Sequence, residues 1–233
     1  MTVASDEVLL RATGLDAGYH GQPIVRGLDL ELRAGEMVGL FGANGTGKTT
    51  SLMTLAGVQR PLAGSIMLGG APHPGSLYKA ARVGLALLTD DRGIFAPLTV
   101  RDNLRLGQGR VDDALAHFPE LRDHLDRRAG LLSGGQQQML AVARILASRP
   151  KVVLADELSL GLAPLIVRRL LSALRAAADE GATVLIVEQH VPVALAMVDR
   201  AVVLARGRVA LEQDAASLRA TPEAITDLYL AAA

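Results

Sequence analysis

A glycine-rich segment constrains the fold of this chain more than any other part of its sequence. Residues 42–50 read Gly-Ala-Asn-Gly-Thr-Gly-Lys-Thr-Thr and match the pattern G-x-x-x-x-G-K-[ST]. An apolar run, 37–41, comes before it and a helical pattern follows to about residue 56, as expected for a buried strand, a tight turn and a helix. Glycines let successive N–H groups point at phosphate oxygens, and the helix N-terminus adds its dipole. The predicted nucleotide-binding residues are Gly42, Ala43, Asn44, Gly45, Thr46, Gly47, Lys48, Thr49 and Thr50.

Composition narrows the class of protein. The chain has 233 residues, half of them hydrophobic, so it can bury a sizeable core and is not intrinsically disordered. Its 24 basic and 24 acidic residues cancel, and it holds only three Tyr and three Phe, so a general nucleic-acid binder is not expected. The absence of cysteine excludes disulfides and thiolate metal sites. No secretory signal and no apolar run of the ~20 residues that a membrane span needs is visible.

A second acidic motif follows another apolar run. Residues 152–155 are Val-Val-Leu-Ala, and Asp156 and Glu157 come directly after them. Ligands of parallel α/β sheets bind beyond the carboxyl ends of the strands, so both acids are expected beside the phosphate loop. Asp156 would hold Mg²⁺ with the Thr49 hydroxyl, and Glu157 would polarise the attacking water. The alternative is a solvated acidic pair that closes a strand.

The pattern of apolar residues predicts an α/β fold. The first third favours strands, the middle from about residue 99 is polar and helical, and the last third alternates strand and helix, which implies a mainly parallel sheet. The polar middle therefore resembles a helical subdomain inserted into an α/β core. The expected strands are 8–12, 25–32, 37–41, 65–68, 83–88, 152–155, 183–187 and 201–204.

The segment 132–138, Leu-Ser-Gly-Gly-Gln-Gln-Gln, predicts a second anion site. Ser133 is a good N-cap, and the two glycines after it expose N–H groups at a helix start. Two anion sites in one chain suggest two chains that share two nucleotides. The alternative is an ordinary glycine-containing helix cap.

With the phosphate loop before it and Asp156-Glu157 after it, this segment resembles the signature of ABC transporter ATPases. The resemblance covers almost the whole chain. It implies a P-loop NTPase core with an N-terminal antiparallel β subdomain, in one nucleotide-binding domain with its core at about 1–89 and 150–233 and its helical subdomain at about 95–149. It also implies ATP and Mg²⁺ as cofactors and a head-to-tail dimer, homomeric or heteromeric. The signature residues that would contact the partner's ATP are Leu132, Ser133, Gly134, Gly135 and Gln136.

The same resemblance assigns further positions. Tyr19 lies where an aromatic side chain stacks on adenine, and Asp90 occupies the slot of the Q-loop glutamine, close to Mg²⁺. The switch position falls on Gln189 or His190, and either side chain could contact the γ-phosphate. Leu158 stands where the family has proline. The D-loop residues, expected to cross the dimer interface, are Ser159, Leu160, Gly161, Leu162 and Ala163.

Several segments, among them 118–121, 159–164 and 187–189, resemble the second ATPase of branched-chain amino acid importers, the LivF-like branch. That branch implies a peripheral subunit on the cytoplasmic face of the cell membrane. Its partners would be permease subunits, contacted around residues 92–104, and indirectly a periplasmic or lipid-anchored binding protein. Two alternatives stay open: a non-transport ABC ATPase, and a nucleotide-gated regulatory subunit with weak hydrolysis.

Overall fold

The computed structural model describes residues 6–188 and 191–220 of the chain. A six-stranded sheet forms its centre, and four of the strands, β3, β8, β7 and β6, run parallel to one another. Strand β9 is parallel to β3, and β10 pairs antiparallel with β9 at the edge. From edge to edge the strands are β10 (Arg208–Asp214), β9 (Arg200–Ala205), β3 (Met37–Phe41), β8 (Thr183–Val187), β7 (Val152–Asp156) and β6 (Leu85–Leu88).

The N-terminal part folds into a second, antiparallel sheet of four strands in the order β2–β1–β4–β5. Its strands are β1 (Val8–Tyr19), β2 (Gln22–Arg33), β4 (Ala63–Leu68) and β5 (Ala71–Pro72). A two-residue turn joins β1 to β2, and both of its residues, His20 and Gly21, have positive φ, as a type I′ hairpin requires. The predicted antiparallel β subdomain is therefore present, with strands longer than the alternation of apolar residues indicated.

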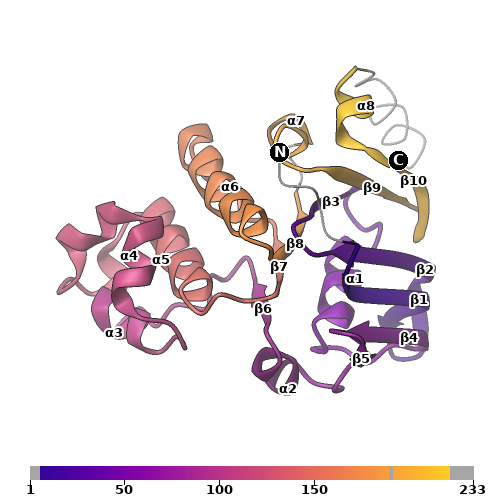
Figure 1. The fold of residues 1–233 in the computed structure, drawn as a ribbon, viewed down its shortest axis with the longest axis horizontal. Coiled ribbons are helices and arrows are strands. Elements are labelled where there is room, and N and C mark those ends of the chain that lie inside the picture. Colours follow the sequence, from indigo (N-terminus) through magenta and orange to yellow (C-terminus); the bar gives the residue numbers. More distant parts are fainter. Residues whose placement is uncertain (1–5, 189–190, 221–233) are drawn as a thin grey trace.

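Helices cover the central sheet and extend to one side of it. Helices α3, α4 and α5 lie in the chain between β6 and β7, and Figure 1 shows them at the far side from the antiparallel sheet. Two 3₁₀ turns, 119–124 and 129–131, link α4 to α5. The helices are α1 (Lys48–Leu55), α2 (Leu77–Arg82), α3 (Val100–Arg105), α4 (Val111–His117), α5 (Gly134–Leu146), α6 (Pro164–Asp179), α7 (Val191–Leu195) and α8 (Ala215–Ala220).

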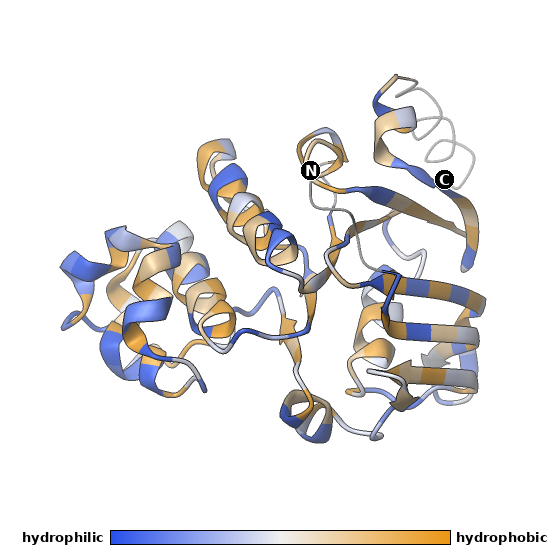
Figure 2. Ribbon diagram, in the orientation of Figure 1, coloured by the Kyte–Doolittle hydropathy of each residue, from blue (hydrophilic) through white to orange (hydrophobic). Residues whose placement is uncertain are grey.

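Two apolar cores, one on each face of the central sheet, explain the apolar runs of the sequence. Along β3, Met37 and Phe41 belong to the core under the helices, whereas Val38 and Leu40 belong to the core shared with the antiparallel sheet. Every residue of β3, β7 and β8 is buried. Figure 2 shows these central strands as hydrophobic, while α6 alternates between hydrophilic and hydrophobic residues. The mainly parallel α/β fold expected from the sequence is confirmed; the subdomain boundaries near 95 and 149 stay a prediction.

Some element bounds differ from the sequence-based expectation. Strand β6 begins at Leu85 rather than Val83, because Val83 is the C-cap of α2 and Gly84 has a φ of +101°. Helix α2 and the edge strand β10 were not predicted. Strand β10 is mostly exposed, so it lacks the apolar run that marks the inner strands.

Substitution of Phe118 tests how much the core under the helices contributes to the stability of the chain. Its ring is fully buried, and we expect Phe118→Ala to lower the free energy of unfolding by about 3–5 kcal/mol, because it removes a large buried side chain and leaves a cavity. Urea unfolding followed by circular dichroism measures this change. The matched control is Phe95→Ala, since the Phe95 ring is 54% exposed and its loss should change stability by only about 0.5 kcal/mol. Equal losses for the two variants would contradict the assignment of Phe118 to the core.

Candidate nucleotide site

The phosphate loop turns sharply at the carboxyl end of β3, and two of its positions require glycine. Gly42 has a φ of +149°, and a Cβ atom there would lie 2.4 Å from the carbonyl oxygen of Leu204. Gly47, with a φ of +101°, lies so close to β2 that a Cβ would approach Cγ2 of Val25 to 2.2 Å. The close packing of the neighbouring strands thus leaves room only for glycine at these two positions of the loop.

Lys48 begins α1, and its side chain turns back over the loop. It is buried, and its Nζ donates to the carbonyl oxygens of Gly42 at 2.9 Å and Ala43 at 3.0 Å. Burial lowers the pKa of Lys48, while the nearby carboxylates of Glu157 and Asp156 act in the opposite direction. The ammonium group therefore lies at the loop, between its carbonyls and two acids.

A hollow of about 380 Å³ opens over this loop. Ile24, from β2, is an apolar lining residue that the sequence analysis did not identify. Tyr19, at the end of β1, is 48% exposed, and it is not among the described residues that line the hollow. The one feature of the sequence that points to Ile24 is its position shortly after Tyr19, on the second strand of the same hairpin. The lining residues are Ile24, Asn44, Gly45, Gly47, Lys48, Thr49, Thr50 and Glu157.

Asp156 contacts the phosphate loop, as expected for an acid at the carboxyl end of a parallel strand. The Thr49 hydroxyl donates to Asp156 Oδ1 at 3.3 Å, which joins the start of α1 to the end of β7. Burial raises the pKa of Asp156 to about 6; the Thr49 hydrogen bond opposes this shift, Glu157 and Asp90 add to it, and Lys48 opposes it. A bound cation would favour the ionised carboxylate.

Hydroxyl and carboxylate oxygens are ligands that suit Mg²⁺, which usually takes one or two carboxylates and completes its shell with phosphate and water. Within residues 6–188 and 191–220, no group of three or more His, Cys, Asp or Glu residues forms a protein-only metal cage. Thr49 and Asp156 could therefore hold Mg²⁺ only together with a ligand such as a nucleotide phosphate.

Glu157 and Asp90 flank Asp156 in different ways. Glu157 lines the hollow, and its backbone has a φ of +45°, which is uncommon for a residue with a Cβ. Its N–H donates to the carbonyl of Val187 at 2.9 Å. Asp90 is exposed in the loop after β6, and its Oδ1 accepts from the Asp91 N–H at 2.9 Å, so this carboxylate shapes its own loop.

The signature segment forms a capping box at the start of α5. Ser133 Oγ accepts from the Gln136 N–H at 3.3 Å, and Gln136 Oε1 accepts from the Ser133 N–H at 3.0 Å. Leu132 is buried beneath this cap, and Gly134 and Gly135 form the first turn of the helix. None of these residues lines the hollow over the phosphate loop in the described part of the chain.

The D-loop passes from β7 to α6 beside the signature helix. Leu160 is 60% exposed, and Gly161 has a φ of +70°. Leu162 packs on the helical core, and Ala163 is the N-cap of α6. Ser159 is buried and bonds to Glu188, a contact that no sequence pattern indicated. Gln189 and His190, the candidates for the switch, lie outside the described residues.

Arginine side chains fasten the loop after β6 to α5. Arg92 donates to Gln137 Oε1 at 2.6 Å and to Gln138 Oε1 at 3.1 Å. Arg144, on α5, donates to the carbonyl of Gly93 at 2.6 Å. No local sequence pattern marks Arg92 as a link to the signature helix, because its partners are 45 and 46 residues away.

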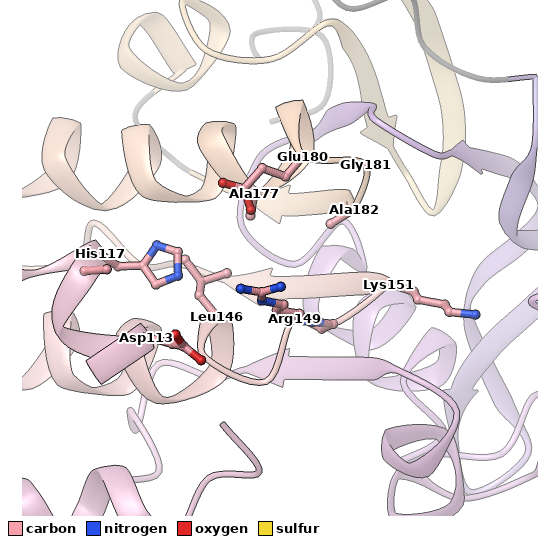
Figure 3. A pocket seen from close by; sticks show the side chains of 11 residues that line it. Asp113, His117, Leu146, Arg149, Lys151, Ala177, Glu180, Gly181 and Ala182 are labelled. Carbon is pink, nitrogen blue, oxygen red and sulfur yellow. The ribbon is translucent and has the colours of Figure 1, made fainter. Parts of the chain in front are cut away.

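A separate cavity of about 450 Å³ lies at the opposite end of the central strands from the phosphate loop (Figure 3). Asp113 and His117 line it from α4, Arg149 and Lys151 from the turn before β7, and Glu180 from the end of α6. It adjoins the amino ends of β7 and β8. The carboxyl ends, where parallel α/β sheets bind ligands, carry the phosphate loop instead, so this cavity does not belong to the nucleotide site.

Comparison with known proteins agrees with this geometry. A family model described as ABC transporter matches residues 25–159, more than half of the chain. The chain is 40% identical to the high-affinity branched-chain amino acid transport ATP-binding protein BraG of Pseudomonas aeruginosa, over 91% of this chain and 95% of that protein. It is 34% identical to a protein of Archaeoglobus fulgidus described as a probable branched-chain amino acid transport ATP-binding protein, LivF, over 90% and 94% of the two chains.

Solved structures share the fold. The ATP-binding subunit of an ABC transporter superposes with a TM-score of 0.81 at 25% identity, over 95% of this chain and 98% of that chain. A dimeric bacterial ABC transporter cassette superposes with a TM-score of 0.77 at 23% identity, over 88% and 98%. The second likeness concerns the fold alone.

Substitution at Gly47 tests the packing of the loop. We expect Gly47→Ala to weaken binding of a fluorescent ATP analogue by about 10-fold or more, because the new Cβ would collide with Val25 and the loop must shift from its place over the phosphates. Gly45→Ala is the matched control: Gly45 also has a positive φ, but its Cβ would meet no atom within 4 Å. Fluorescence titration compares the two, and equal affinities would contradict the collision.

Proposed function

Because the chain belongs to the ABC transporter family, as an ATP-binding subunit and an ATPase, we propose that it drives an importer of branched-chain amino acids or related amino acids and amides. The observation that carries the proposed site is the Thr49–Asp156 contact, which joins the phosphate loop to the end of β7 and leaves Glu157 in the hollow above it. The import branch rests on the relatives BraG and LivF, whose described roles are in branched-chain amino acid transport.

In this proposal the phosphate loop holds the β- and γ-phosphates of ATP. The backbone N–H groups of residues 42–50 and the N-terminus of α1 supply donors and a positive dipole end. Lys48 Nζ would leave the carbonyls of Gly42 and Ala43 for phosphate oxygens, since a compact ammonium group with three donors suits either set of acceptors. Tyr19 would stack on adenine beside the apolar Ile24.

Thr49 and Asp156 are proposed to hold Mg²⁺, and Asp90 to approach it from the loop after β6. The ion would supply charge neutralisation at the β- and γ-phosphates. Burial raises the pKa of Asp156, and a bound cation would oppose that shift because it favours the ionised carboxylate. Asp90 already contributes to the electrostatic environment of Asp156, which supports its placement on this side of the loop.

Glu157 is proposed to orient the attacking water. Its side chain lines the hollow that contains Lys48 and Thr49, and it follows the buried end of β7. Gln189 or His190 would contact the γ-phosphate. Hydrolysis needs little covalent chemistry from the protein, so these side chains act by positioning groups and by stabilising charge.

The signature residues of one subunit are proposed to complete the site of another. Residues 132–136 carry the intact capping box that begins α5, and they do not line the hollow of their own chain. A head-to-tail dimer, homomeric or heteromeric, would bring them to the partner's γ-phosphate. The D-loop, with Leu160 exposed, would cross the same interface.

The permease is proposed to dock near segment 92–104, which comprises the loop after β6 and most of α3. Phe95 and Leu98 are exposed apolar residues there. Hydrogen bonds of Arg92 and Arg144 connect the loop after β6 to the signature helix, so a displacement of this loop would be transmitted to α5. No helix in the part of the chain that the structure describes is long and apolar enough to cross a membrane. We place the subunit at the cytoplasmic face of the membrane, where the permease would hold it, with the substrate-binding protein on the opposite side.

Replacement of Glu157 tests the catalytic assignment. We expect Glu157→Gln to keep ATP binding and to lower phosphate release by about 10²- to 10⁴-fold, because the amide retains the shape of the side chain but lacks the negative charge that orients and polarises the water. Steady-state phosphate release and titration with a fluorescent ATP analogue measure the two quantities. Glu180→Gln, at the other end of the sheet, is the matched control and should turn over normally. Normal turnover of Glu157→Gln would overturn the assignment.

Co-expression of this chain with its permease distinguishes the proposed transporter function from the alternative of a regulatory subunit. The exposure of Asp90 and the leucine at position 158 motivate the regulatory alternative. ATP binding without phosphate release, with or without the permease, would favour it, whereas permease-stimulated hydrolysis and leucine uptake support the transporter.

The dimer is tested at Ser133. In a Glu157→Gln background, where ATP should persist, we expect Ser133→Arg to block ATP-dependent dimerisation because its bulk would enter the proposed interface. ATP binding by the monomer should stay within about 2-fold, since Ser133 does not line its own hollow. Ser133→Ala also removes the cap but adds no bulk, so it separates the loss of the cap from the obstruction. Size-exclusion chromatography with ATP measures dimerisation, and an ATP-dependent dimer of Ser133→Arg would count against the model.

A further inference from the structure

A buried carboxyl group links the end of β8 to the D-loop. Glu188 directly follows β8 and is 1% exposed, and Ser159 is 5% exposed. The Ser159 backbone N–H donates to Glu188 Oε1 at 3.1 Å, and the Ser159 hydroxyl donates to Glu188 Oε2. Both oxygens of one carboxyl group therefore contact a single residue, 29 positions away. A buried carboxyl group is stable only when such partners are present.

This link stands beside the strained residue of the candidate site. Glu157 has a φ of +45°, and its N–H is held by the carbonyl of Val187. The chain from Glu157 to Ser159 is thus bonded at both ends to consecutive residues of the β8 terminus. Between them Leu158 is buried, and as a residue other than proline it does not restrict its own φ. Strained backbone persists only where surrounding contacts determine it.

We propose that Glu188 is a positioning residue, which acts through Ser159 to hold the Glu157 backbone in its left-handed conformation and so keeps the Glu157 side chain in the hollow over the phosphate loop. The inference rests on the proposed role of Glu157 in orienting water. It adds a residue that does not line the hollow and to which no sequence motif assigned a role. Because Ser159 also begins the D-loop, the same contact connects the site of each subunit to the segment proposed to reach its partner.

The structure suggests which substitutions break the contact and which preserve it. Glu188→Ala removes both acceptors, and Ser159→Ala removes the hydroxyl but keeps the backbone N–H. Glu188→Gln can accept from that N–H through its amide oxygen and donate to the Ser159 hydroxyl through its amide nitrogen. Glu36→Gln is a matched control, since Glu36 is another buried glutamate, bonded to Arg200 at 2.7 Å at the amino end of the sheet.

The kinetics of ATP hydrolysis by the purified chain test the proposal. We expect Glu188→Ala and Ser159→Ala to lower kcat by about 10-fold, with KM and ATP affinity within about 2-fold, because the Glu157 side chain would leave its position. Glu188→Gln should stay within about 3-fold of the wild type. The kcat of the double variant Glu188→Ala/Ser159→Ala should be only slightly lower than that of Glu188→Ala, since both changes disrupt the same contact. Glu36→Gln should lower Tm and leave kcat unchanged.

The outcomes separate this inference from the proposed function. If Glu157→Gln abolishes turnover but Ser159→Ala and Glu188→Ala both keep the wild-type kcat, the positioning role of Glu188 is wrong and the proposed function stands. If Glu157→Gln turns over normally, the function itself fails. Should Glu188→Ala not fold, Ser159→Ala decides: an unchanged kcat overturns the proposal, and a lowered kcat with an unchanged ATP affinity supports it.

Discussion

The parallel pairing of β3, β8 and β7 brings three chain segments to one edge of the sheet, and the candidate site depends on that pairing. The phosphate loop follows β3, Asp156 and Glu157 lie at the end of β7, and Glu188 follows β8. In an antiparallel arrangement of the same strands, neighbouring carboxyl ends would point in opposite directions. Burial on both faces stabilises the parallel arrangement, because helices and a second sheet cover it.

Close packing then determines the conformation of the loops at this edge. Strand β2 and the end of β9 approach the phosphate loop so closely that Gly47 and Gly42 cannot carry a Cβ without movement. The short chain from Glu157 to Ser159 is bonded at both ends to the β8 terminus. Chemical groups that act by position alone need such rigid support, because small displacements of a catalytic group weaken catalysis strongly.

Local sequence patterns predicted the elements whose cause is local. The strand 37–41 and the strand 183–187 were expected with the bounds observed, because uninterrupted apolar runs of that length suit a strand buried on both faces. Ser133 was expected as a cap, and its capping box is present, because the interaction spans only three residues. The Thr49–Asp156 contact could also be anticipated, since the carboxyl ends of parallel strands lie at one edge of the sheet.

The sequence by itself therefore determined the α/β class, the phosphate loop, the acidic pair after β7 and the cap of α5. Each is encoded in residues within a few positions of one another, where backbone preference and apolar periodicity act. Only the tertiary structure decided that Ile24 lines the hollow, that Arg92 bonds to Gln138, and that Glu188 bonds to Ser159. Those contacts join residues far apart in the chain, and their geometry arises when the strands and helices pack, so no local pattern records them.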